Sequence, residues 1–175
     1  MSPEDQYPST DDCAPILSQG DDPVLLVLEN ALARYEERPS RNTYIGQGYS
    51  KGKAPVCAIG AVWAVGNGEE DELAGKAAHG GTGAALAATI EEYLRQEALD
   101  AIGLLNAVAL EEHPDAVDFG GWSGPLEWVN QEWKPPGWDP WAGSEDADLL
   151  RPVSEEVARL YRLAIDRRKE ELAVA

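Results

Sequence analysis

The spacing of apolar residues between Ala84 and Glu112 is the strongest constraint on how this chain can fold. Seven apolar side chains recur there at intervals of three or four positions: Leu86, Ile90, Leu94, Ala98, Ala101, Leu105 and Val108. This period places all of them on one face of an α-helix. We therefore expect one long helix over 84–112, with Gly103 as the position for a bend, that ends before Pro114.

Capping residues and prolines predict a helix at each end of the folded region. Asp22 followed by Pro23 is typical of a helix start, and Pro39 stops that first helix near residue 38. Ser154 is the expected N-cap of a final helix over 154–170, with acidic residues in its first turn and basic residues near its end. The buried stripe expected for this last helix is Val157, Leu160, Tyr161, Ala164 and Ile165.

The remaining segments are shorter. The apolar run Cys57–Val65 predicts a buried helix, and Leu126–Trp133 is the place for a short helix inside a segment rich in tryptophan, glycine and proline. Residues 42–54 are expected to form a loop or a small β-hairpin, with Thr43–Ile45 as a strand. Residues 1–21 carry little to bury and predict a disordered acidic tail. The sequence therefore predicts a mostly α-helical, compact single domain over 22–175.

Length and composition support one soluble domain. The chain has 175 residues, of which 43% are hydrophobic, enough for one ordinary core. No apolar run is long enough to span a membrane, and the N-terminus is acidic where a signal peptide would be basic and then apolar. We expect a cytoplasmic protein without membrane contact.

Cysteine and histidine are too sparse to predict a disulfide framework or a metal centre. The four residues are Cys13, Cys57, His79 and His113, and they lack the closely spaced ligand pairs of structural zinc sites. We therefore expect no metal, and no motif in the chain indicates a cofactor.

Charge is the strongest compositional signal, because 32 acidic residues oppose 14 basic ones and give a formal net charge of -18. Direct binding to nucleic acid is not expected, since the affinity for phosphates depends on a basic surface. The excess is concentrated between Ala54 and Leu150, where 18 acidic residues face 3 basic ones. This acidic middle is either a solvated surface or a face for a basic partner.

The stretch YIGQGYSKGKAP, from Tyr44 to Pro55, resembles a phosphate-binding loop only superficially. A Walker loop requires a glycine five positions before Gly52, where this chain has Gln47. It also requires a serine or threonine after the lysine, where this chain has Ala54. The stretch is therefore interpreted as a glycine-rich turn with solvent-facing lysines.

Cys57 is the one candidate nucleophile, because a helix N-terminus can lower the pKa of a thiol. His79 or His113 would then serve as its base and Asn130 would orient that base. A small buried cysteine with a structural role is the other interpretation. Adjacent carboxylates such as Glu111 and Glu112 diverge on a helix and do not form an acid/base pair.

Three stretches carry a family resemblance: PVCAIGAVWAV (Pro55–Val65), LEWVNQEW (Leu126–Trp133) and VSEEVARLYRLAID (Val153–Asp166). Together they resemble an uncharacterised family of high-GC bacteria and their phages, domain of unknown function 6197. The resemblance implies a compact, mostly helical fold and a phage or prophage origin. It implies no activity, and the insert Trp133–Trp141 departs from the family pattern.

The sequence favours a non-catalytic acidic binding protein that modulates a host or phage partner by protein–protein contacts. Its candidate binding residues are the tryptophans and carboxylates Trp133, Trp138, Trp141, Glu69, Glu70, Asp71 and Glu72, since tryptophan is enriched in binding hot spots. The expected partner is a protein with a basic surface. Two alternatives are a Cys57-dependent small hydrolase or transferase, and a DNA mimic that inhibits a DNA-binding protein.

Overall fold

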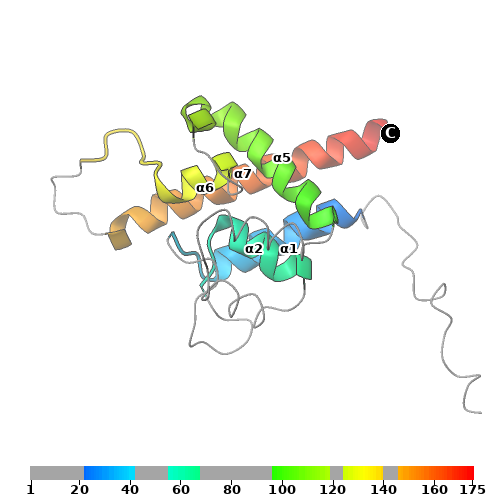
Figure 1. Cartoon of the computed structure of the whole chain (residues 1–175), viewed down its shortest axis with the longest axis horizontal. Helices are drawn as coiled ribbons and strands as arrows, with labels where there is room; N and C mark the ends of the chain where they lie inside the picture. Colours follow the sequence, from blue (N-terminus) through cyan, green and yellow to red (C-terminus); the bar gives the residue numbers. More distant parts are fainter. Residues whose placement is uncertain (1–21, 42–54, 68–95, 119–123, 140–145) are drawn as a thin grey trace, which may run out of the picture.

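The longest helix, α7 (Asp146–Val174), runs along the long axis of the molecule (Figure 1). The computed structural model describes residues 22–41, 55–67, 96–118, 124–139 and 146–175. Within these ranges the chain forms five α-helices and one short 3-10 helix, and no strand. The predicted mostly α-helical, compact fold is confirmed for this part of the chain.

Helix α1 (Pro23–Glu37) begins and ends where its local sequence predicts. The Asp22 carboxylate accepts a hydrogen bond from the Leu25 amide at 3.0 Å, and Pro23 occupies the first helical position, where no amide donor is needed. At the other end Arg38 is extended, as expected for a residue before proline. The buried face of α1 packs against α2, α5 and α7.

Helix α2 (Ala58–Asn67) is the buried helix predicted from the apolar run that starts at Cys57. The residues from Val56 to Val62 are all buried, so α2 is enclosed by α1, α5 and α6. Just before it, Val56 pairs with Pro39 in an isolated parallel β-bridge, with N···O distances of 2.8 and 3.0 Å. This bridge fixes the start of α2 beside the end of α1.

Helix α5 (Gln96–Glu112) crosses α7 obliquely (Figure 1), and η3 (Pro114–Asp118) follows it directly. The predicted end before Pro114 is confirmed, and the helix continues through Gly103, which is exposed. Its buried stripe contains Ala98, Ala101, Leu105 and Val108, as the spacing predicts. Residues 84–95 of the predicted helix lie outside the described residues.

Helix α6 (Gly124–Gln131) is short and is capped by side chains from distant parts of the chain. Asn106 of α5 accepts a hydrogen bond from the Leu126 amide at 3.0 Å, and Arg41 donates to the carbonyl of Asn130 at 3.2 Å. Gly124 adopts a positive φ of 59°, and a Cβ at this position would lie 2.6 Å from the Asn106 side chain. A glycine is therefore required where α6 meets α5.

The predicted start of the last helix at Ser154 is wrong, because α7 begins at Asp146. Pro152 lies inside the helix, where it removes one backbone hydrogen bond without ending the helix. Leu149 and Val153 are buried and continue the apolar stripe through the proline, so packing maintains the helix there. The Ser154 hydroxyl donates to the Arg151 carbonyl at 2.9 Å and does not cap a helix start.

Two further expectations, the disordered tail over 1–21 and the hairpin over 42–54, fall outside the described residues. None of the described helices is long and apolar enough to cross a membrane.

Asp22 joins the start of α1 to the last turns of α7. Arg168 donates two hydrogen bonds to its carboxylate, both at 2.8 Å, in a bidentate pair that is mostly shielded from water. The hydrogen bond from Arg168 holds the pKa of the Asp22 carboxyl below its ordinary value. One carboxylate therefore caps a helix and binds a guanidinium at the same time.

We expect the substitution Asp22→Ala to lower the free energy of unfolding by about 2 kcal/mol, because it removes both an N-cap and a bidentate ion pair. Urea denaturation at pH 7 measures this change. Because the pKa of Asp22 is lowered on folding, its contribution is present above the ordinary aspartate pKa and is lost as the pH falls through the folded value. The difference between wild type and variant should therefore shrink at low pH.

Glu29→Ala is the matched control, since it removes the exposed contact between Glu29 and Lys169, which are 3.7 Å apart. Its effect should stay below about 0.5 kcal/mol. Equal losses in the two variants would show that the position of Asp22 has no special effect on stability.

Candidate functional site

Buried polar side chains from several helices meet around the first turn of α2. Cys57 precedes the helix as its N-cap residue, and its Sγ atom accepts a hydrogen bond from the Gly60 amide at 3.2 Å. Only 1% of the Cys57 side chain is exposed. The thiol therefore satisfies a backbone donor that the helix leaves without a partner.

Glu127 of α6 satisfies the adjacent donor. Its Oε1 atom accepts from the Ile59 amide at 2.8 Å, and its Oε2 atom accepts from the Gln131 side chain at 2.9 Å. The side chain is completely buried, which is rare for a carboxylate. A negative charge at a helix N-terminus is also favoured by the helix dipole, so Glu127 links α6 to α2 by both effects.

Asn130, one turn after Glu127, forms hydrogen bonds to neighbouring segments through both its side-chain oxygen and its side-chain nitrogen. Its Oδ1 atom accepts from the Tyr35 hydroxyl at 3.0 Å, and its Nδ2 atom donates to the carbonyls of Ser40 and Arg41 at 3.0 and 3.2 Å. Asn130 is completely buried. It therefore ties α6 to α1 and to the segment that follows α1.

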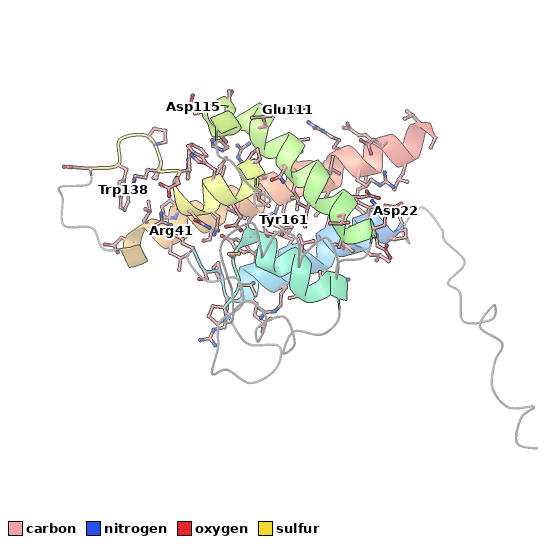
Figure 2. All side chains as sticks on the ribbon, in the orientation of Figure 1. Asp22, Arg41, Glu111, Asp115, Trp138 and Tyr161 are labelled. Carbon is pink, nitrogen blue, oxygen red and sulfur yellow. The ribbon has the colours of Figure 1, made fainter. Side chains whose placement is uncertain are left out.

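Two stacked tyrosines complete the buried group. Figure 2 shows Tyr161 of α7 at the centre of the helices, where its hydroxyl donates to the Ala58 carbonyl at 2.6 Å. The rings of Tyr35 and Tyr161 are stacked with centroids 6.4 Å apart. Helices α1, α2, α6 and α7 each contribute to this group, which we call the polar core: Tyr35, Cys57, Glu127, Asn130 and Tyr161.

Burial dominates the electrostatics of the polar core. Desolvation raises the pKa of Glu127 above its ordinary value, although hydrogen bonds from Ile59 and Cys57 oppose the shift. Desolvation, followed by the nearby Glu127 carboxylate, raises the pKa of Cys57 well above its ordinary value. The pKa values of Tyr35 and Tyr161 are raised well above normal for the same first reason. The thiol is therefore kept in the neutral form, which is a poor nucleophile.

The structure does not assemble the predicted catalytic group within the described residues. The ring of His113 hydrogen-bonds the Glu156 carboxylate at 2.8 Å and lies between Trp128 and Trp133, with ring centroids 6.2 and 5.6 Å away. Asn130 binds Tyr35 and backbone carbonyls, so these hydrogen bonds of His113 and Asn130 go to groups other than Cys57. His79 lies outside the described residues. Within the described ranges, no group of three or more histidine, cysteine or acidic side chains is placed to hold a metal ion.

Only part of the candidate binding surface can be located. Trp133 and Trp138 follow α6, are half-buried and pack against the hydrophobic core, and Figure 2 shows Trp138 at the periphery of the molecule. Trp141, Glu69, Glu70, Asp71 and Glu72 lie outside the described residues. The role of these side chains in binding stays a prediction.

Glu127 is the member of the polar core that sequence reasoning missed. One signal was available: Glu127 and Asn130 are three residues apart and share a helical face with the apolar residues Leu126 and Val129. A charged residue in phase with an apolar stripe indicates a buried carboxylate with dedicated partners.

Comparisons with protein-family models, curated proteins and solved structures found no match to this chain. The resemblance to domain of unknown function 6197 therefore stays an expectation from the sequence.

The N-cap position of Cys57 makes a specific prediction about substitutions. Cys57→Ser keeps an acceptor for the Gly60 amide, and serine is a favoured N-cap, so we expect a loss of less than about 1 kcal/mol in the free energy of unfolding. Cys57→Val has a similar size but no acceptor, and should lose about 2 kcal/mol because the buried Gly60 amide is left without a partner. Urea denaturation of both variants gives the two values.

A valine variant as stable as the serine variant would contradict the N-cap role. The Cys13→Ser variant tests whether the loss of a cysteine in itself changes stability, and it provides a background in which Cys57 is the only thiol.

The buried carboxyl of Glu127 predicts a pH-dependent difference between wild type and Glu127→Gln. A carboxyl whose folded pKa lies above its ordinary value of 4.5 stabilises the fold most at low pH. That contribution is lost as the pH rises through the folded pKa. The neutral amide has no such dependence, so Glu127→Gln should gain stability relative to wild type between pH 5 and pH 8.

Unfolding free energies measured at pH 5 and pH 8 test this expectation. Glu132→Gln removes an exposed carboxylate just after α6 and should follow wild type at both values. A difference between wild type and Glu127→Gln that did not change with pH would contradict the raised pKa.

Proposed function

We propose that this protein is a non-catalytic acidic binding protein that modulates a host or phage partner by protein–protein contacts. The observation that carries the proposal is the use of the basic side chains of α7. All six basic residues of this helix contact carboxylates, on α1, on α5 or within α7 itself: Arg151, Arg159, Arg162, Arg167, Arg168 and Lys169.

These pairs connect helices. Arg162 binds Glu36 of α1 at 2.9 Å, Arg159 binds Glu112 of α5 at 2.9 Å, and Arg167 binds Glu111 of α5. Each basic side chain of α7 therefore already has a carboxylate partner within this chain. Since acidic residues outnumber basic ones by 18 over the whole chain, the remaining surface charge is negative and favours a basic partner.

The polar core supports a structural use of Cys57 in preference to a catalytic one. A nucleophilic cysteine must be reached by substrate and must form a thiolate. Here the Cys57 thiol is buried, and its pKa is raised well above normal. Its hydrogen bonds go to the first turn of α2 and to Glu127. A catalytic role for Cys57 is not needed to account for any of these contacts.

Capture of partners from the lysate of the host cell, at two salt concentrations, tests the acidic surface. If the acidic segment Glu69–Glu72 is the interface, reversing these four charges to lysine should abolish capture of the main partner. Capture by wild type should weaken as salt rises, because the screening length falls to about 8 Å near physiological ionic strength. The matched control reverses four scattered exposed carboxylates, which changes the net charge equally: Asp100, Glu132, Asp166 and Glu170.

Tryptophan anchors make a competing prediction. If Trp133, Trp138 or Trp141 is the anchor, capture should be nearly independent of salt, and substitution by alanine should weaken binding by about 2 kcal/mol or more. Equal loss in the four-charge variant and its control would indicate non-specific attraction. A partner released by duplex DNA would favour the DNA-mimic alternative, and no salt-sensitive partner at all would contradict the proposed function.

A further inference from the structure

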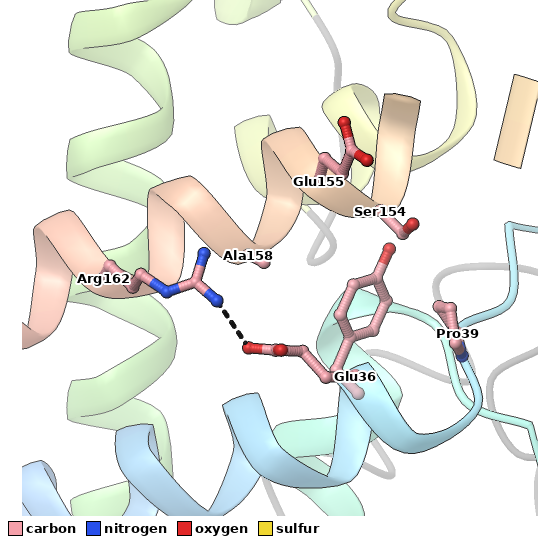
Figure 3. Close-up of a pocket in the computed structure, with 7 residues that line it drawn as sticks. Glu36, Pro39, Ser154, Glu155, Ala158 and Arg162 are labelled. Atoms are coloured by element: carbon pink, nitrogen blue, oxygen red, sulfur yellow. Dashed lines mark hydrogen bonds and ion pairs between the residues drawn. The ribbon is translucent and has the colours of Figure 1, made fainter. Parts of the chain in front are cut away.

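A groove of about 230 Å³ lies between α1 and α7. Figure 3 shows Glu36 and Pro39 on the side of α1, with Ser154, Ala158 and Arg162 on the side of α7. Tyr35, which is fully buried, and Glu155 complete the lining. This volume is enough for one long side chain or a small organic molecule, and too small for a drug-sized ligand.

Apart from Arg162, the lining side chains present hydrogen-bond acceptors. The Tyr35 hydroxyl donates its proton to Asn130, and the Ser154 hydroxyl donates its proton to the Arg151 carbonyl. Pro39 has no amide hydrogen, and ionised carboxylates accept only. Among the side chains that line the groove, Arg162 is the remaining donor, and its guanidinium is bound to Glu36 at 2.9 Å while keeping further N–H groups.

The formal charge of the lining residues also favours a cation. Two carboxylates, Glu36 and Glu155, oppose the single guanidinium of Arg162, so the lining carries a formal charge of -1. Arg151, outside the lining, pairs with Glu155 at 3.3 Å, and both side chains of that pair are exposed. The side chains of Glu36 and Arg162 are 46% and 57% exposed, and an ion pair this exposed contributes little stability. A second cation can therefore approach Glu36 without a large loss from the existing pair.

The apolar part of the groove suits the stem of a long cationic side chain. Pro39 and Ala158 contribute apolar surface to the lining, on the sides of α1 and α7 respectively. Lysine and arginine bury their methylene stems against such surface while the charged head reaches acceptors. We propose that this groove binds a lysine or arginine side chain of a basic partner protein. The proposal rests on the proposed function, and it names one contact of that interface.

Titration of the ¹⁵N-labelled protein with a short acetylated and amidated peptide of alternating lysine and glycine tests the groove. Amide shifts should be concentrated near residues 36–39 and 154–162. Glu36→Gln should weaken the peptide about fivefold, since it removes the carboxylate within the groove. Ser154→Leu should weaken it by at least as much, because a leucine side chain fills the groove without changing the charge.

Glu37→Gln is the matched control, because it removes the same charge one residue away from the lining and should change the affinity less than about twofold. Thermal melting of each variant confirms that it is folded. Equal weakening by Glu36→Gln and Glu37→Gln, or no weakening by Ser154→Leu, would overturn the groove proposal and leave the acidic binding function in place.

Two further titrations distinguish a lysine or arginine side chain from other ligands of the groove. Shifts at the same residues caused by an alternating glutamate and glycine peptide would overturn the choice of a cation. Shifts caused by free spermidine, without any caused by the lysine peptide, would assign the groove to a small free amine and overturn a protein partner there. Loss of the proposed function has its own readout, which is the absence of a salt-sensitive partner in the lysate experiment.

Discussion

The contact between the buried carboxylate of Glu127 and the first turn of α2 is the interaction on which the centre of this fold depends. A buried ionisable group is unfavourable unless its hydrogen bonds are satisfied, and the backbone amide of Ile59 and the side chain of Gln131 supply that satisfaction. The Glu127 carboxylate and the Cys57 thiol in turn accept hydrogen bonds from two backbone amides in the first turn of α2, those of Ile59 and Gly60. These hydrogen bonds are directional, so they set the positions of α2 and α6 relative to each other. Apolar packing is less directional and would fix that orientation less tightly.

Charge organises the periphery in a complementary way. Helix α7 carries its basic residues along two sides, so it pairs with α1 through Glu36 and Asp22 and with α5 through Glu111 and Glu112. Adjacent carboxylates on α5 thus reach different arginines, as their divergence on a helix predicts. A strongly acidic chain would otherwise repel itself in the folded state, and α7 relieves that repulsion along its contacts with α1 and α5.

The features that the sequence predicts well are those with local causes. Both ends of α1 follow from Asp22, Pro23 and Pro39, and the end of α5 follows from Pro114. The start of α7 was misjudged because the stabilising effect of burying Leu149 and Val153 outweighs the single hydrogen bond lost at Pro152, and burial depends on tertiary packing. The role of Glu127 was missed for a similar reason, since its partner Ile59 is 68 residues away. The groove between α1 and α7 also has no local signal, because Glu36 and Ser154 become neighbours only when the two helices pack.

The distant caps of α6 have a consequence for how the chain folds. A helix of eight residues is not stable alone in water, and α6 receives its end groups from Asn106 and Arg41, which precede it by 20 and about 90 residues. Its backbone can be satisfied only after α5 and the segment following α1 have reached their final positions. We therefore expect helix α6 to form late in folding, and its amides to exchange with solvent when the packing of the surrounding helices opens.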